Sequence, residues 1–127
     1  MTIEIVLDAS ALLAVVNQEP GWQAVVAYRA PMISAVNLAE VYAKLEERGS
    51  PSSHARSNLA ASGVEVITFD ETQAYLSGQL RMSTRRAGLS FGDRACLAAA
   101  MSRDLPVLTG DRSWATLDVG IEVGLFR

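Results

Sequence analysis

The stretch Ile3-Glu-Ile-Val-Leu-Asp-Ala-Ser10 decides the fold class, because two kinds of secondary structure meet within it. Residues 3–7 are aliphatic apart from one glutamate, and they predict a short β-strand that ends at Asp8. The Ala-, Leu- and Val-rich run that follows predicts a helix with Ser10 as its N-cap. A strand followed directly by a helix indicates the first half of a βαβ unit.

The same alternation continues to the end of the chain. Further strands are expected at residues 31–34, 64–69, 106–108 and 121–123, the last of them at an edge of the sheet. Further helices are expected at residues 22–29, 35–48, 52–62, 71–86 (capped by Asp70) and 91–104 (capped by Ser90). Strands separated by helices favour parallel pairing with helices on both faces of the sheet. The sequence therefore predicts a single three-layer α/β/α domain over residues 1–127, with a mainly parallel sheet of four or five strands.

The composition is that of one compact globular domain, with 127 residues of which 50% are hydrophobic and 20% charged. Cys96 is the only cysteine, so no intramolecular disulfide can form, and a cytoplasmic protein is expected. The 11 basic and 14 acidic side chains give a net charge of −3, which excludes a polycation that coats DNA or membranes by charge alone. No uncharged run is long enough to span a membrane, so no membrane association is expected.

Four acidic residues fall near the carboxyl ends of the predicted strands, where open parallel sheets bind their ligands. They are Asp8 and Asp111, which follow strands, and Asp93 and Glu40, which lie in the first two turns of helices. Carboxylates gathered at one edge repel one another unless a cation lies among them. Because oxygen-only ligands select Mg²⁺ or Mn²⁺, the four acids form a candidate metal-dependent site.

Each acid also has a purely structural interpretation. Asp93 follows a serine by three residues, the spacing of a capping box, and Asp111 stands in a Thr-Gly-Asp sequence typical of a turn. Glu40 precedes Lys44 by four residues, which suits an ion pair on one helix face. Asp8 is the hardest to explain in this way, because a charge that closes an apolar strand in a buried sheet is poorly solvated.

Four segments around these acids resemble the acidic motifs of PIN domains. In chain order they are Val6–Leu12, Asn37–Val41, Phe91–Ala98 and Leu108–Trp114. The resemblance extends over essentially the whole chain. Its compact length and the Glu-Pro-Gly sequence after the first helix are similar to the VapC toxins of bacterial toxin–antitoxin pairs.

The resemblance implies a metal-dependent endoribonuclease with a site of defined composition. Asp8 and Asp93 would bind Mg²⁺ or Mn²⁺ most directly, and Glu40 and Asp111 would position water or a second ion. Supporting hydroxyls would come from Ser10 and Thr109. The family expectation also includes an RNA substrate such as transfer or ribosomal RNA, a cognate antitoxin protein whose tail occupies the active-site groove, and a homodimer.

Two observations on the residues themselves bear on this chemistry. His54 is the only histidine, so catalysis by a pair of histidines lacks its second member, and a metal ion must activate the nucleophile. Arg81, Arg85 and Arg86 stand in a stretch without acidic residues, and they either hold the RNA backbone or form a solvated helix face.

Three other protein classes gather acids in a similar fold. Haloacid-dehalogenase phosphatases need a second Asp two positions after the first, where this chain has Ser10. Response-regulator receivers need a lysine on a late strand, and none follows Lys44. The remaining alternative is a non-catalytic PIN-like module that binds RNA or protein, and metal-dependent RNA cleavage would decide between it and the enzyme.

Overall fold

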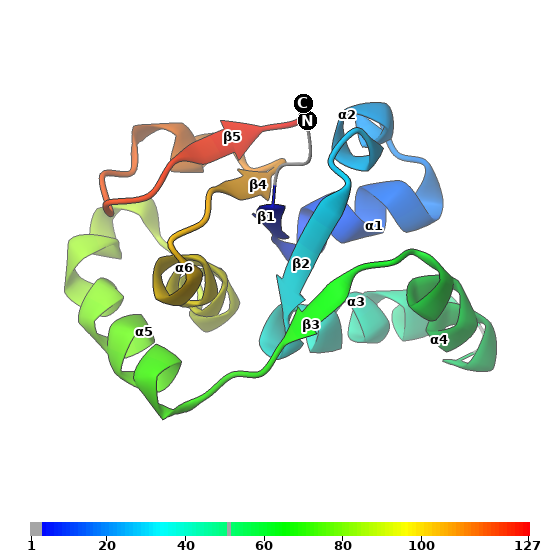
Figure 1. Cartoon of the computed structure of the whole chain (residues 1–127), viewed down its shortest axis with the longest axis horizontal. Helices are drawn as coiled ribbons and strands as arrows, with labels where there is room; N and C mark the ends of the chain where they lie inside the picture. Colours follow the sequence, from blue (N-terminus) through cyan, green and yellow to red (C-terminus); the bar gives the residue numbers. More distant parts are fainter. Residues whose placement is uncertain (1–3, 51) are drawn as a thin grey trace.

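A computed structural model describes residues 4–50 and 52–127 of the chain. Its single sheet has five parallel strands in the order β3-β2-β1-β4-β5 (Figure 1). The strands are β1 (Glu4–Leu7), β2 (Ala30–Ser34), β3 (Glu65–Ile67), β4 (Val107–Thr109) and β5 (Val123–Leu125). The predicted α/β class and parallel sheet are confirmed. Ile3, the first residue of the predicted opening strand, lies outside the described residues.

Six α-helices and two 3₁₀-helices, η1 and η2, connect and cover the strands within the described part of the chain. They are α1 (Ala9–Asn17), α2 (Trp22–Val26), α3 (Ala35–Glu47), α4 (Ser52–Ala61), α5 (Glu71–Ser83), η1 (Arg85–Ala87), α6 (Phe91–Arg103) and η2 (Arg112–Thr116). No helix among the described residues has the length and hydrophobicity needed to cross a membrane.

The N-cap predicted for the first helix is wrong by two residues. Asp8, not Ser10, caps α1, because the Asp8 carboxylate accepts a hydrogen bond from the Ala11 backbone N–H at 2.9 Å. Ser10 already lies within the helix, and its hydroxyl donates back to Asp8. The N-caps predicted at Asp70 and Ser90 are confirmed.

Several element boundaries also differ from the prediction. Helix α2 ends at Val26 rather than at residue 29, and β3 spans Glu65–Ile67 rather than residues 64–69. Helix α5 ends at Ser83 rather than Arg86, and at this end the Leu80 carbonyl accepts both the Thr84 backbone N–H at 2.9 Å and the Thr84 hydroxyl at 2.6 Å. The edge strand β5 begins at Val123, because Val123 and Gly124 pair with Val107 and Leu108 of β4. The strand predicted at 121–123 therefore lies two residues further along the chain, at Val123–Leu125.

The sheet lies between two layers of helices, as predicted. Figure 1 shows α1 to α4 on one side of the sheet and α5 and α6 on the other. Side chains alternate along β1 accordingly: Ile5 and Leu7 join the core under α1 to α4, and Val6 joins the core under α5 and α6. Residues of α6 are almost entirely buried from Ala95 to Ala100, so this helix is the most enclosed part of its layer.

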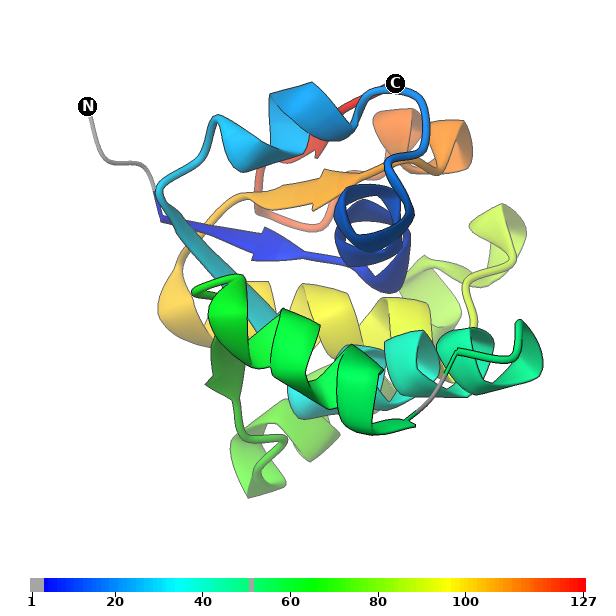
Figure 2. The same ribbon diagram turned by 90° about the vertical axis from the view of Figure 1, so that its right-hand side faces the viewer.

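The strand order reverses direction between β1 and β4. The chain moves from β1 outward to β2 and β3, and then returns to place β4 and β5 on the opposite side of β1. Open parallel sheets bind ligands beyond the carboxyl ends of the strands at such a switch point. Figure 2 shows the arrowheads of β1 (blue) and β4 (orange) side by side and pointing to the same edge of the molecule.

Candidate active site

Asp8 lies at the switch point, directly after β1, and only 6% of its surface is exposed. Its Oδ1 atom accepts hydrogen bonds from the Ser10 hydroxyl at 2.7 Å and the Ala11 backbone N–H at 2.9 Å. Its Oδ2 atom accepts from the Thr109 hydroxyl at 2.5 Å. Three donors, one of them at the end of the neighbouring strand β4, therefore hold this buried carboxylate in place.

The same two hydroxyls extend the network into the segment after β4. Ser10 Oγ accepts the Gly110 backbone N–H at 3.0 Å, and Thr109 Oγ1 accepts the Asp111 backbone N–H at 3.0 Å. The supporting role expected for Ser10 and Thr109 thus takes the form of hydrogen bonds that join the ends of β1 and β4. Through Thr109 they also link the backbone of Asp111 to the carboxylate of Asp8.

The carboxylate of Asp111 is turned toward its own segment. It accepts hydrogen bonds from the Ser113 backbone N–H at 3.0 Å and the Ser113 hydroxyl at 2.7 Å, and it caps η2. The residue is exposed. The turn interpretation of Asp111 is therefore confirmed, while its backbone remains part of the network around Asp8.

Asp93 lies in the first turn of α6 and is half-buried. Its Oδ2 atom accepts the Ser90 backbone N–H at 2.9 Å, and the Ser90 hydroxyl accepts the Asp93 backbone N–H at 3.1 Å. These reciprocal bonds form the capping box that the Ser90–Asp93 spacing suggested.

Glu40 is exposed on α3 but is held against the first turn of α6. The buried Asn37 amide donates to Glu40 Oε1 at 2.8 Å and to the Gly92 carbonyl at 2.9 Å. A Cβ atom built on Gly92 would lie 2.5 Å from both carboxylate oxygens of Glu40, so only glycine leaves room for this approach. The ion pair considered between Glu40 and Lys44 does not form. Lys44 Nζ instead lies 3.6 Å from Glu47 Oε2.

Three of the four acids act on one buried group. Burial raises the pKa of the Cys96 thiol on α6 well above its usual value, and the negative charges of Asp8, Asp93 and Glu40 raise it further. Burial likewise raises the pKa of Asp8, hydrogen bonds from Thr109, Ser10 and Ala11 oppose the rise, and the charge of Asp93 adds to it. The charges of carboxylates at the end of β1, on α3 and on α6 therefore all act on this one buried thiol.

No cation within the described residues pairs with these carboxylates. None of the four acids forms an ion pair within residues 4–50 and 52–127. Arg94 follows Asp93 in sequence, but its guanidinium donates to the Ser77 carbonyl at 3.0 Å and lies 5.9 Å from the centre of the Phe91 ring.

A family model for the PIN domain matches residues 5–120 of the sequence. The chain belongs to the PIN-domain family. The match begins within β1 and ends just before β5, so it includes all four acidic motifs. No curated protein matches the sequence significantly.

Several solved structures have folds similar to that of this chain. A DNA-bound VapBC from Salmonella typhimurium has 20% identity and a TM-score of 0.75, with 99% of this chain and 100% of that chain covered. VapC20 of Mycobacterium tuberculosis, described as a sarcin-ricin loop cleaving toxin, has 17% identity and a TM-score of 0.75, with 91% and 97% covered. FitAcB from Neisseria gonorrhoeae has 20% identity and a TM-score of 0.68, with 94% and 96% covered.

The donor set of this PIN domain fits a hard divalent cation. No three His, Cys, Asp or Glu side chains among the described residues are grouped closely enough to enclose a metal ion by themselves. Mg²⁺ does not need such a cage, because it keeps several waters and binds through one or two carboxylates. Asp8, which is buried and has no cationic partner among the residues that the structure describes, and Asp93, whose charge acts on it, provide oxygen donors of this kind.

Sequence reasoning identified the acids of this PIN domain but missed Asn37 and Gly92. Asn37 is 1% exposed and positions Glu40, and Gly92 gives Glu40 space on α6. The signal for Asn37 was its place three residues before Glu40, which puts both on one helix face. The role of Gly92 depends on how α3 crosses α6, and no local pattern encodes that contact.

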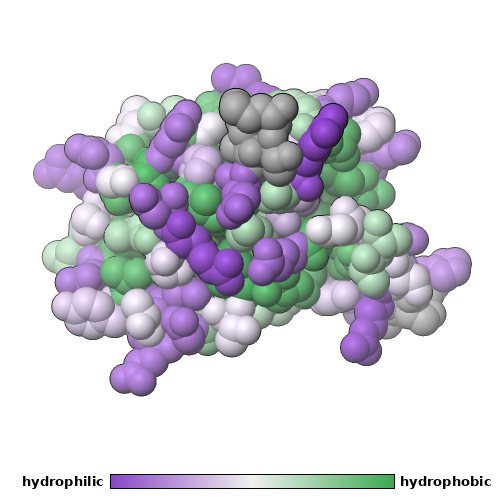
Figure 3. Space-filling model, viewed as in Figure 1, coloured by the Kyte–Doolittle hydropathy of each residue, from purple (hydrophilic) through white to green (hydrophobic). Residues whose placement is uncertain are grey.

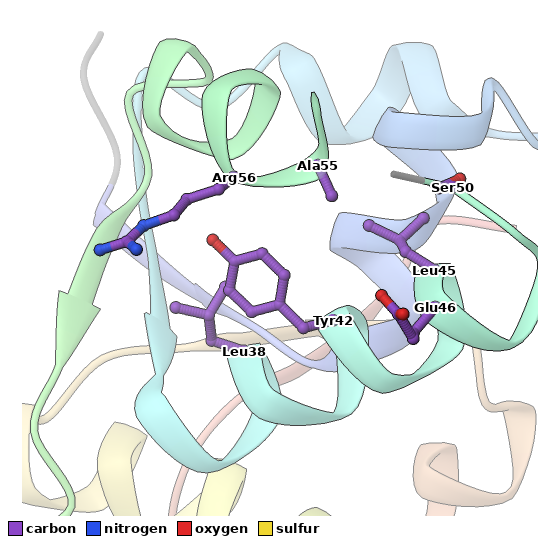
Figure 4. Close-up of a pocket in the computed structure, with 7 residues that line it drawn as sticks. All are labelled: Leu38, Tyr42, Leu45, Glu46, Ser50, Ala55 and Arg56. Carbon is purple, nitrogen blue, oxygen red and sulfur yellow. The ribbon is translucent and has the colours of Figure 1, made fainter. Parts of the chain in front are cut away.

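Two apolar cavities of the PIN domain lie away from the acids. One, of about 450 Å³, lies between α3 and α4, and Figure 4 shows Leu38, Tyr42 and Leu45 of α3 projecting toward Ala55 of α4. A second cavity, of about 150 Å³, is lined in part by residues of α1 and α2. Hydrophobic residues gather on the surface in this region, at the right of Figure 3. Neither cavity is lined by any of the four acids.

The network around Asp8 predicts a large cost for losing one hydroxyl. Thr109→Val keeps the shape of the side chain but leaves Asp8 Oδ2 and the Asp111 backbone N–H without their partners, so we expect a loss of about 1–3 kcal/mol in the free energy of unfolding. Urea unfolding at neutral pH in EDTA measures it. Ser113→Ala is the matched control, since its exposed hydroxyl also bonds an aspartate and should cost at most about 0.5 kcal/mol. Equal losses in the two variants would contradict the network.

Proposed function

We propose that this PIN domain is a metal-dependent endoribonuclease of the VapC toxin kind, formed by the whole chain from residue 1 to 127. The observation that carries the proposal is the carboxylate of Asp8. It is buried at the switch point of a parallel sheet, has no cationic partner in the described part of the chain, and lies near two further acids. Maintaining such a charge is costly for stability alone, which favours a functional role.

The substrate class is supported by the folds that resemble this one. Among them is VapC20, which is described as cleaving the sarcin-ricin loop. We infer a structured RNA such as a transfer or ribosomal RNA loop as the substrate of this chain.

The four acids would have different roles in the reaction, because their surroundings differ. Asp8 and Asp93 would hold Mg²⁺ or Mn²⁺, which lowers the pKa of a bound water and stabilises charge on the phosphoryl oxygens. Glu40 is exposed and fixed by Asn37, so its carboxylate can orient the attacking water and accept its proton. Asp111 supplies a second exposed carboxylate at the same edge. Attack of water on phosphorus breaks the bond to the 3′ oxygen, which leaves a 5′-phosphate and a 3′-hydroxyl.

We further propose that the protein is cytoplasmic, that it forms a homodimer, and that a cognate antitoxin binds it. Several folds similar to this one come from VapBC toxin–antitoxin complexes, which supports a protein partner that covers the active-site groove. The free, buried thiol of Cys96 is compatible with a reducing compartment.

One observation favours a second candidate function, a non-catalytic PIN-like module that binds RNA or protein. Each of the four carboxylates accepts a hydrogen bond from its own element, so each has a local structural partner. A protein that kept these acids only for capping would retain the fold without cleaving RNA.

RNA cleavage separates the two functions. We expect purified protein with Mg²⁺ or Mn²⁺ to produce new 5′-phosphate ends in total RNA, which sequencing of those ends detects. Asp8→Asn keeps the volume of the side chain but removes its charge, so cleavage should be abolished while the circular dichroism spectrum stays unchanged. Metal-dependent cleavage by Asp8→Asn would exclude the role of Asp8, and no cleavage by the wild type would favour the binding module.

The close approach of Glu40 to Gly92 predicts loss of activity without loss of stability. In Gly92→Ala the new methyl displaces the flexible carboxyl of Glu40, so we expect cleavage to fall about 100-fold while the free energy of unfolding changes by less than about 1 kcal/mol. Gly78→Ala on α5 is the matched control, because a Cβ there meets nothing within 4 Å. The control should cleave like the wild type. Full activity of Gly92→Ala would show that the position of Glu40 is unimportant.

A further inference from the structure

A cleft of about 580 Å³ separates η1 from η2. It is lined by Ser83, Arg86, Ala87, Ser113, Thr116, Leu117 and Asp118. Both walls continue from segments that carry acids of the site: η1 leads into α6 and Asp93, and η2 begins directly after Asp111. Figure 2 shows η1 (yellow-green) and η2 (orange) on the same side of the molecule as the carboxyl ends of β1 and β4.

Opposite charges occur in this cleft without pairing. Arg86 and Asp118 are both exposed, and neither makes a hydrogen bond or an ion pair with another described residue. The hydroxyl of Ser113 already donates to Asp111 at 2.7 Å, so the η2 wall is tied to the active site. The cleft therefore offers a free cation and a free hydrogen-bond acceptor, and Ser113 in its wall bonds Asp111, while Ala87 and Leu117 form its apolar part.

A ribonucleotide has the groups that match this arrangement. Its phosphate is the anion that an arginine binds through parallel N–H donors. Its ribose carries a 2′-hydroxyl, which can donate to a carboxylate and which distinguishes RNA from DNA. A carboxylate repels the phosphate backbone, so Asp118 would contact a hydroxyl group of such a ligand rather than its phosphate.

We propose that the cleft between η1 and η2 binds one nucleotide of RNA beside the cleaved bond, with Arg86 on the phosphate and Asp118 accepting the ribose 2′-hydroxyl. The inference rests on the proposed ribonuclease function and adds the means by which the site selects RNA over DNA.

The cleft also distinguishes among the three arginines that the sequence offered as RNA contacts. Arg81, Arg85 and Arg86 are all exposed and unpaired in the described structure, but only Arg86 lines the cleft. Arg85 adjoins Arg86 in η1 and carries the same charge, so it is a matched control for long-range attraction.

The test measures binding of a short fluorescent single-stranded RNA, and of DNA of the same sequence, by fluorescence anisotropy in EDTA. We expect Arg86→Ala to weaken RNA binding about tenfold and to reduce the slope of log K against log salt by about 0.7. Arg85→Ala should change affinity much less. Asp118→Ala should lower the preference for RNA over DNA about tenfold without weakening DNA binding, since the DNA lacks the 2′-hydroxyl.

Equal effects of Arg86→Ala and Arg85→Ala, or an unchanged RNA preference in Asp118→Ala, would overturn the proposal. If the wild type cleaves RNA with metal while either result is obtained, the cleft assignment fails and the ribonuclease function stands. If the wild type neither binds nor cleaves RNA, both fail. Weaker binding of a partner protein by Arg86→Ala, with RNA binding unchanged, would assign the cleft to protein recognition and also overturn the proposal.

Discussion

Burial of the Asp8 carboxylate at the end of β1 is the constraint on which the rest of the site depends. An ionised carboxylate in a packed sheet is stable only when hydrogen bonds or charges replace its lost water. Here Ser10 and Ala11 of α1 and Thr109 of β4 supply the hydrogen bonds, so they come from both sides of the switch point. The same bonds fix the ends of β1 and β4 relative to each other. The burial of Asp8 is unfavourable for stability, but its hydrogen bonds set the geometry of the sheet edge that carries the site.

Each of the other three acids also has a structural role. Asp93 closes a capping box at the start of α6, Asp111 caps η2, and Glu40 is clamped to α6 through Asn37. The helix dipole favours an aspartate at a helix N-terminus. In a parallel sheet with helical connections, these N-termini lie beside the carboxyl ends of the strands, where ligands bind. The structural and functional interpretations of these residues are therefore compatible, and only measurements that depend on metal or substrate separate them.

The sequence predicted the features that depend on local patterns. The alternation of apolar strands and helices indicated a parallel sheet between two helical layers, and the acids at the strand ends indicated where a site would form. Details that depend on tertiary contacts were not predictable in this way. Ser10 had the sequence of an N-cap, but Asp8 takes that position through Oδ1, while Thr109 of β4 donates to its Oδ2. The role of Gly92 likewise arises only from the packing of α3 on α6.

The central claim is that the acids around Asp8 form a cation site, and the effect of metal on the stability of Asp93→Asn tests it most directly. Thermal melts of wild type and variant are compared in EDTA and in Mg²⁺ or Mn²⁺ well above Kd. In EDTA the variant should melt at or above the wild type, because relief of repulsion with Asp8 offsets the weakened dipole interaction. With metal at about 100 times Kd, the wild type should gain about 2.7 kcal/mol and the variant much less, which reverses the order. A variant destabilised equally in both conditions would show that Asp93 is only a helix cap and would contradict the account.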